Sequence, residues 1–181
     1  PGAAGILCTL ADRIDAPLMD AAGPSLKVVS NFAVGVDNVD VAEASRRGIR
    51  VCNTPDVLTD ATADVTWALI LGITRRVVEG DRLVRRGGWE RWTFDFMLGT
   101  ELRGKTLGIV GLGRVGTELA KRARAFEMRI VAYDPYVSQE RARDIGAELD
   151  TLDSVLKTAD FLSVHTPLTD ATKSLITAKE L

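Results

Sequence analysis

Short apolar runs alternate with helix-like segments along most of the chain. The runs that read as strands, through their apolar or β-branched residues, are 5–10, 26–30, 49–53, 105–111, 129–134 and 160–166. The segments with helical spacing or helix-end signals are 16–22, 40–48, 60–86, 114–126, 139–145 and 152–158. Alternation of this kind indicates βαβ units. The chain is therefore predicted to be an α/β protein with two separate open parallel sheets.

The helix expected after the second strand carries recognisable signals at both ends. Asp40 and Glu43 have the spacing of a capping box, in which each side chain binds the other residue's backbone N–H. Gly48 is a natural left-handed terminator at the other end. These signals place the helix between the second and third strands.

The longest helical segment, residues 60–86, joins the two sheet-forming regions. Apolar residues recur on it four positions apart, at Val65, Leu69, Ile73 and Val77. We expect an interruption near Gly80 and Asp81, because glycine weakens a helix interior. The following segment, 89–103, contains four aromatic residues without a clear period. It is interpreted either as a loop packed on the core or as an arm that contacts another subunit.

Composition and charge narrow the classes of function. The 181 residues are 46% hydrophobic and 27% charged, which is ordinary for a globular protein. The formal net charge of −2 offers no basic excess for nucleic acid, and no apolar run approaches a membrane span. Two isolated cysteines and one histidine do not make a usual zinc site, so no metal is expected. We expect a cytoplasmic protein.

The strongest chemical signal is a G-x-G-x-x-G turn at Gly111, Gly113 and Gly116, between a predicted strand and a predicted helix. Gly111 permits the tight turn, Gly113 lets a pyrophosphate approach the backbone, and Gly116 lets the helix pack closely. The helix N-terminus offers N–H groups to phosphates, and Arg114 can add a charge-assisted bond. An ordinary glycine turn is the alternative.

An acidic residue completes this pattern. Asp134 ends the next predicted strand, 18 residues after Gly116. A carboxylate there can accept both ribose hydroxyls of NAD and would repel the 2′-phosphate of NADP. Pro135 and Tyr136 follow, so no adjacent arginine compensates. NAD is therefore predicted over NADP, with an exposed turn aspartate as the alternative.

Two further segments carry weaker signals. His165, the only histidine, closes the strand at 160–166 and could be a general acid. We favour a residue that lines the adenine side of a pocket or is simply packed, because this strand, counted as the third, belongs to the adenosine half. The segment 31–40 follows a strand and could form an anion-binding nest of backbone N–H groups. Spacing alone favours a plain strand-to-helix connection.

Several motifs in one order resemble the D-isomer-specific 2-hydroxyacid dehydrogenase family over essentially the whole chain. They are NFAVGVDNVD at 31–40, NTPDVLTDATAD at 53–64, GKTLGIVGLGRVG at 104–116, YDP at 133–135 and HTPLT at 165–169. The first two segments look most like glyoxylate/hydroxypyruvate reductases. The stretch at 99–116 and YDP are also similar to phosphoglycerate dehydrogenases.

The resemblance implies a domain organisation. Residues 1–53 would be part of a flavodoxin-like substrate domain, 54–103 a hinge helix with a dimerisation arm at 89–103, and 104–181 the first half of a Rossmann NAD-binding domain. The active cleft would lie between the substrate and cofactor domains, and the arm would help to form a homodimer. The implied substrate is a small 2-oxo or 2-hydroxy acid.

The resemblance also implies roles for particular residues. Backbone N–H groups of Ala33, Val34 and Gly35 would hold the substrate carboxylate, with Val34 also near the nicotinamide. The residues that would line the dinucleotide are Gly111, Leu112, Gly113, Arg114, Val115, Gly116, Asp134, His165, Thr166 and Pro167. The family's catalytic arginine, glutamate and histidine are expected beyond Leu181, and an opening strand before Pro1. The chain is thus expected to be an inactive fragment of an oxidoreductase. The alternative is a non-catalytic NAD(H)-sensing module that resembles corepressors of the same fold.

Overall fold

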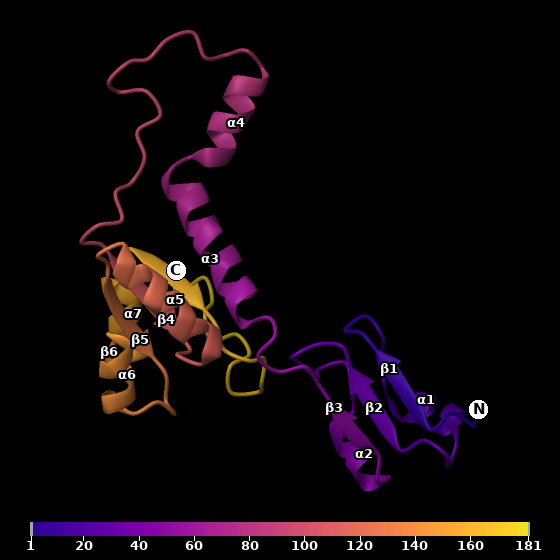
Figure 1. Ribbon diagram of the computed structural model, residues 1–181. Helices are drawn as coiled ribbons and strands as arrows, with labels where there is room; N and C mark the ends of the chain where they lie inside the picture. Colours follow the sequence, from indigo (N-terminus) through magenta and orange to yellow (C-terminus); the bar gives the residue numbers. More distant parts are fainter. Residues whose placement is uncertain (1, 181) are drawn as a thin grey trace. The chain divides into compact units, whose positions relative to one another are not determined.

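The computed structural model describes residues 2–180, and its contacts divide the chain into two compact units, one up to Leu58 and one from Thr59 onward. Each unit contains one open parallel sheet with helices (Figure 1). The predicted α/β class with two parallel sheets is confirmed. The functional division into 1–53, 54–103 and 104–181 stays a prediction. No helix within residues 2–180 is long and apolar enough to cross a membrane.

The first unit is a three-stranded sheet with two short helices. Its elements are β1 (Gly5–Cys8), α1 (Ala16–Ala22), β2 (Val28–Asn31), α2 (Val41–Arg46) and β3 (Arg50–Cys52). The strands lie in the order β1-β2-β3, and both pairings are parallel. The core cluster of this unit contains Cys8, Ile14, Met19, Leu26, Val29, Val39, Ala44 and Ile49. The alternating strand and helix pattern therefore predicts this unit to within a few residues.

The helix cap at α2 is half of the predicted capping box. The Asp40 side chain accepts a hydrogen bond from the Glu43 backbone N–H at 2.9 Å. The predicted reciprocal bond, from the Asp40 N–H to the Glu43 side chain, is wrong. The Asp40 N–H donates instead to Ile14 O at 2.9 Å. The Glu43 carboxylate instead pairs with Arg46 and Arg47. Two nearby guanidinium groups outcompete a single neutral amide for this carboxylate.

The second unit contains a four-stranded parallel sheet. Its elements are α3 (Thr59–Thr74), α4 (Val77–Arg85), β4 (Thr106–Val110), α5 (Arg114–Ala125), β5 (Arg129–Tyr133), α6 (Gln139–Ile145), β6 (Glu148–Leu149), α7 (Leu152–Thr158) and β7 (Phe161–Val164). The strands lie in the order β6-β5-β4-β7. The strand β6 was absent from the prediction, because two residues are too few to show an alternating pattern.

Helices cover both faces of this sheet. On one face Leu107 and Ile109 of β4 belong to a core cluster with Leu119 and Ala123 of α5. On the other face, a Cβ atom at Gly108 would lie only 2.7 Å from Ala159 Cβ, beside α7. Because neighbouring residues of a strand face opposite sides, β4 is buried by both layers. From β4 the chain adds β5 and β6 on one side, and then returns to place β7, also parallel, on the other side of β4. This change in strand order makes the carboxyl ends of β4 and β7 a topological switch point.

The long predicted helix breaks earlier than expected. It ends at Thr74, Arg76 has a left-handed backbone with φ +54°, and α4 begins at Val77. The predicted break at Gly80 is wrong, since Gly80 lies inside α4. The Arg76 guanidinium makes two hydrogen bonds to the Glu79 carboxylate, at 2.8 and 2.6 Å, and this pairing accompanies the unusual backbone.

The helix α3 packs on α5 through its Trp67 side, not through the apolar stripe that predicted it. The rings of Trp67 and Phe126 lie 4.8 Å apart, and Arg122 of α5 bonds Asp64 of α3 at 2.8 Å. The stripe residues are instead 57–76% exposed: Val65, Leu69, Ile73 and Val77. Within the described residues, this stripe is therefore an uncovered apolar surface.

The segment 89–103 has no helix or strand. Its aromatic residues are exposed by 58% at Trp89, 76% at Trp92, 81% at Phe94 and 40% at Phe96. The alternative of a loop packed on the core does not hold for these side chains within residues 2–180. The subunit-contact interpretation remains a prediction.

Candidate functional site

The glycine turn between β4 and α5 needs glycine at two positions for steric reasons. Gly111 has φ +96°, and a Cβ there would lie 2.9 Å from the backbone of His165. A Cβ at Gly116 would lie 2.2 Å from Gly111 O, closer than real Cβ atoms come. At Gly113 nothing lies within 4 Å of the Cβ position. Packing thus requires glycine at Gly111 and Gly116, whereas Gly113 has open space in front of the turn.

The start of α5 offers backbone donors to that space. Gly113 is the N-cap residue and supplies no side-chain cap, and the helix hydrogen bonds begin with Thr117 N–H to Gly113 O at 2.9 Å. No described residue accepts a hydrogen bond from the N–H of Gly113, Val115 or Gly116. Unpaired N–H groups at the positive end of a helix dipole bind anions such as phosphate. The arrangement therefore fits the pyrophosphate of a dinucleotide.

Asp134 lies directly opposite the glycine turn and is bonded to it. Its Oδ2 accepts a hydrogen bond from the Leu112 N–H at 2.8 Å, and its Oδ1 accepts one from the Tyr136 N–H at 2.9 Å. Each carboxylate oxygen has a further lone pair that a ribose hydroxyl could use. Leu112 itself is fully buried, so its side chain belongs to the core and its N–H is already occupied by Asp134.

A hollow of about 250 Å³ lies at the carboxyl ends of β4, β5 and β7. Its predicted members are Gly111, Gly113, Asp134, His165, Thr166 and Pro167. Its other members were not predicted: Tyr133, Pro135, Tyr136, Thr169, Ala171, Thr172 and Leu175. Of these, residues 169–175 follow β7 without any regular pattern, so only their proximity to HTPLT could have indicated them. Arg114 and Val115 begin α5, where Arg114 is exposed.

His165 directly follows β7, which is the fourth strand of its sheet along the chain. This strand pairs with β4 on the side away from β5, so the argument that placed His165 on the adenosine half through a third strand is wrong. His165 nevertheless lines the hollow, and its Nε2 lies 2.8 Å from Ser163 Oγ, within hydrogen-bond distance. Burial lowers the pKa of His165 below its ordinary value, which keeps the ring neutral at pH 7.

The third predicted site, the loop at 33–35, lies in the first unit after β2. Ala33 is buried, Val34 is 41% exposed and Gly35 is exposed. No described residue accepts a hydrogen bond from the predicted N–H donors of Ala33, Val34 and Gly35, nor from the N–H of Val36, which was not predicted. Such consecutive donors can bind a carboxylate. The carboxylate of Asp37 is nearby, with Oδ2 3.7 Å from the position that a Gly35 Cβ would take.

Comparison with known proteins agrees with a dinucleotide-binding site in the second unit. Residues 67–181 match the family model described as "D-isomer specific 2-hydroxyacid dehydrogenase, NAD binding domain". The chain is 51% identical over 176 residues to a glyoxylate reductase of Aeropyrum pernix, which covers 95% of this chain and 52% of the relative. It is 47% identical over 180 residues to a glyoxylate reductase of Thermococcus litoralis, covering 97% of this chain and 54% of the relative. The chain thus spans about half the length of these curated relatives.

Solved structures agree in fold. The TT0316 protein of Thermus thermophilus superimposes with a TM-score of 0.90 at 48% identity, covering 96% of this chain and 54% of that one. D-lactate dehydrogenase of Aquifex aeolicus, solved with NAD and lactic acid, gives a TM-score of 0.84 at 30% identity, covering 94% and 50%. The family match extends over more than half of the chain, and the chain therefore belongs to the D-isomer-specific 2-hydroxyacid dehydrogenases.

Proposed function

We propose that this protein is an NAD-dependent oxidoreductase that interconverts a small 2-oxo acid, such as glyoxylate or hydroxypyruvate, with its D-2-hydroxy acid. The single observation that carries the proposal is the hollow formed by the glycine turn and Asp134. It combines helix N–H donors for phosphate with a carboxylate for ribose. The curated relatives named glyoxylate reductase support the substrate class.

The carboxylate of Asp134 favours NAD over NADP at the proposed nucleotide site. When bound, the nicotinamide supplies or accepts the hydride. The N–H groups of Gly113, Val115 and Gly116 would hold the pyrophosphate, and Asp134 would accept hydrogen bonds from the adenosine ribose. A 2′-phosphate near Asp134 would meet a like charge, so we propose that NADP binds more weakly. Thr166 and Pro167 would complete the wall of the hollow.

The loop at 33–35 would bind the substrate by its carboxylate. Its N–H groups favour the charged carboxylate over the neutral carbonyl of a 2-oxo acid, because hydrogen bonds to a charged acceptor are stronger. Holding the carboxylate fixes the orientation of the adjacent keto carbon, which is the atom that is reduced. We assign no general acid among the described residues.

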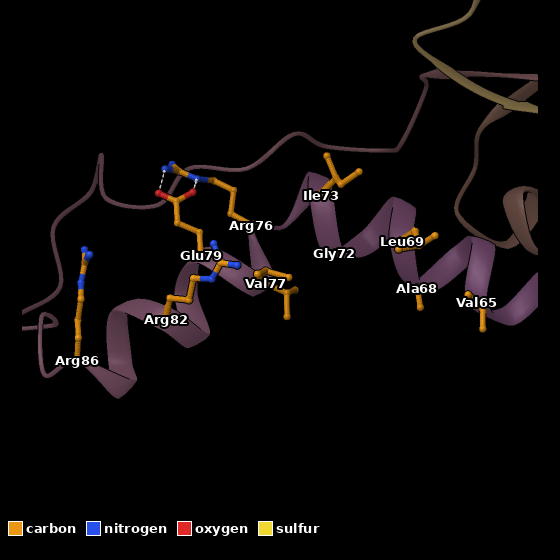
Figure 2. Close-up of a pocket in the computed structure, with 11 residues that line it drawn as sticks. Val65, Ala68, Leu69, Gly72, Ile73, Arg76, Val77, Glu79, Arg82 and Arg86 are labelled. Atoms are coloured by element: carbon orange, nitrogen blue, oxygen red, sulfur yellow. Dashed lines mark hydrogen bonds and ion pairs between the residues drawn. The ribbon is translucent and has the colours of Figure 1, made fainter.

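We also propose that the protein forms a homodimer through residues 89–103. The exposed aromatic residues of this segment support the proposal, together with an open groove of about 830 Å³ along α3 and α4. Figure 2 shows this groove, with Val65, Leu69 and Ile73 projecting from α3 and the Arg76–Glu79 ion pair beyond them. Exposed apolar surface of this extent is typical of an interaction site.

A cofactor oxidation assay tests the proposed function. The full-length protein is incubated with NADH and, separately, with glyoxylate, hydroxypyruvate and 3-phosphohydroxypyruvate. We expect turnover with at least one of the first two and slower turnover with NADPH. An absence of turnover with every 2-oxo acid would contradict the proposal. NADH-dependent binding of a protein partner without turnover would favour the sensing-module alternative.

A further inference from the structure

The backbone carbonyls of the loop at 33–35 are all fastened from one side. Each accepts a hydrogen bond from a donor at the end of β2 or just after β3. The three pairs are Asn31 Nδ2 to Gly35 O at 2.8 Å, Asn53 Nδ2 to Val34 O at 2.9 Å, and Thr54 N–H to Ala33 O at 2.9 Å. The carbonyls of this loop therefore face the carboxyl end of the sheet in the first unit.

This fastening determines where the loop N–H groups point. In a planar trans peptide the C=O and the N–H point in opposite directions, and no described peptide bond is cis. The N–H groups that share peptide planes with the three fastened carbonyls belong to Val34, Gly35 and Val36. They are therefore directed away from the sheet, which agrees with their having no acceptor among the described residues.

The Asn31 side chain is itself locked in one orientation. It is completely buried, and its amide forms a reciprocal pair with the Asn38 amide, with N···O distances of 3.0 and 3.2 Å. The Cys8 thiol donates to Asn31 Oδ1 at 3.2 Å. An inverted Asn31 amide would place its oxygen against Gly35 O, so only one orientation satisfies every partner. This lock is built into the core, not added at the surface.

The amino-acid composition supports a dedicated role. The 181 residues contain only three asparagines, Asn31, Asn38 and Asn53, and all three belong to this hydrogen-bonded frame. A side-chain amide offers a donor without adding charge. A lysine or arginine could donate as well, but would compete with the loop N–H groups for the anion, and an aspartate would repel it.

We propose that Asn53 and Asn31 are positioning residues that orient the N–H groups of Val34, Gly35 and Val36 for the substrate carboxylate. This inference rests on the proposed function and extends it to two side chains that do not touch the substrate. A merely structural role would instead fasten the loop without affecting substrate affinity. The two roles are distinguished by substrate affinity: variants of these asparagines raise the KM and the inhibition constant of a substrate analogue only if the side chains position the loop.

The test uses Asn53→Leu in the full-length protein, because Asn53 is exposed and leucine has a similar size without a donor. We expect the KM for glyoxylate and the inhibition constant of oxamate, an unreactive analogue, to rise roughly tenfold. The variant loses one hydrogen bond to the loop, and a loss of about 1.4 kcal/mol in binding corresponds to a factor of ten. The kcat should fall as well, because the keto carbon loses part of its orientation, whereas the NADH dissociation constant and the melting temperature should change little. Cys52→Ala is the matched control, as this neighbouring exposed residue is outside the frame.

A second variant examines the buried half of the frame. Asn31→Leu keeps the approximate size of the side chain, removes both donors and adds no charge, and we expect the same rise in KM and in the oxamate constant. If this buried variant does not fold, Asn53→Leu decides alone. An active wild type whose Asn53→Leu variant retains both constants within twofold contradicts the positioning role only. A wild type that neither reduces a 2-oxo acid nor binds oxamate contradicts the proposed function as well.

Discussion

Asp134 holds the glycine turn and is also proposed to select the cofactor, and two substitutions separate these roles. Asp134→Ala removes both hydrogen bonds. Leu112 is fully buried, so its N–H is left without a partner and without water. Tyr136 is 92% exposed, so its N–H can bond water instead. Leaving one buried donor unpaired costs about 1–3 kcal/mol, and the exposed one adds little.

The alanine variant should therefore lose stability and nucleotide affinity together. A loss of about 2 kcal/mol corresponds to a fall in melting temperature of roughly 4–8 °C for a domain of this size. Because the Leu112 peptide is part of the turn, the donors of Gly113 and Val115 lose their fixed positions. NADH and NADPH should then both bind more weakly, and NADH by the larger factor, because alanine also removes the ribose acceptor and the charge that repels a 2′-phosphate.

The asparagine variant should change selectivity without the loss of stability. In Asp134→Asn the side-chain oxygen can still accept from the Leu112 N–H, so the turn is kept. The charge that repels a 2′-phosphate is removed, and a like-charge pair a few ångströms apart is worth about 1–4 kcal/mol near a protein surface. We expect the preference for NADH over NADPH to fall at least about fivefold, with NADPH affinity rising.

Fluorescence titration of NADH and NADPH at fixed ionic strength measures both effects, with thermal unfolding recorded alongside. Asp153→Asn is the matched control, because this exposed carboxylate of α7 pairs only with Lys157 among the described residues. An unchanged NADH-to-NADPH ratio in Asp134→Asn would show that the carboxylate does not face the ribose. A fully stable Asp134→Ala would refute the bond to Leu112 as a support of the turn.

Three further predictions concern packing, pH and assembly. Gly116→Ala should lower the free energy of unfolding by about 1–3 kcal/mol in urea, because its Cβ meets Gly111 O. Gly113→Ala should lower it by at most about 1 kcal/mol but weaken NADH binding. The reverse pattern would contradict this assignment of the two glycines. Since burial lowers the pKa of His165, the unfolded chain takes up this proton more readily, and stability should fall as pH drops below about 6.5. His165→Gln should flatten that part of the stability curve, and an unchanged slope would exclude this histidine as its cause. Trp92→Asp should convert a dimer into a monomer in analytical ultracentrifugation, and a persisting dimer would place the interface elsewhere.

Most of the fold was predictable because its signals are local. The helices at 139–145 and 152–158 were predicted with the bounds that the structure shows, since each has a Ser or Thr N-cap and a short, clear pattern. The break at Arg76 was not predictable from residue type, because a non-glycine residue rarely takes the left-handed backbone that Arg76 has. The strand β6 escaped because its existence depends on pairing with β5, not on its own two residues.

In the candidate site, too, only the features with local signals could be predicted from the sequence. The glycine turn could be predicted because each glycine answers a local steric need. The bond from Leu112 to Asp134 joins residues 22 positions apart, and the frame around Asn31 and Asn53 joins the ends of neighbouring strands. Contacts of this kind arise only when the strands pair, so residue order alone does not reveal them.

A crystal structure of the protein with NADH tests the central claim most directly. We predict that the pyrophosphate lies within hydrogen-bond distance of the N–H groups of Gly113 and Val115, with the adenosine ribose on Asp134. A dinucleotide bound elsewhere, or a pyrophosphate that makes no contact with the start of α5, would contradict that claim.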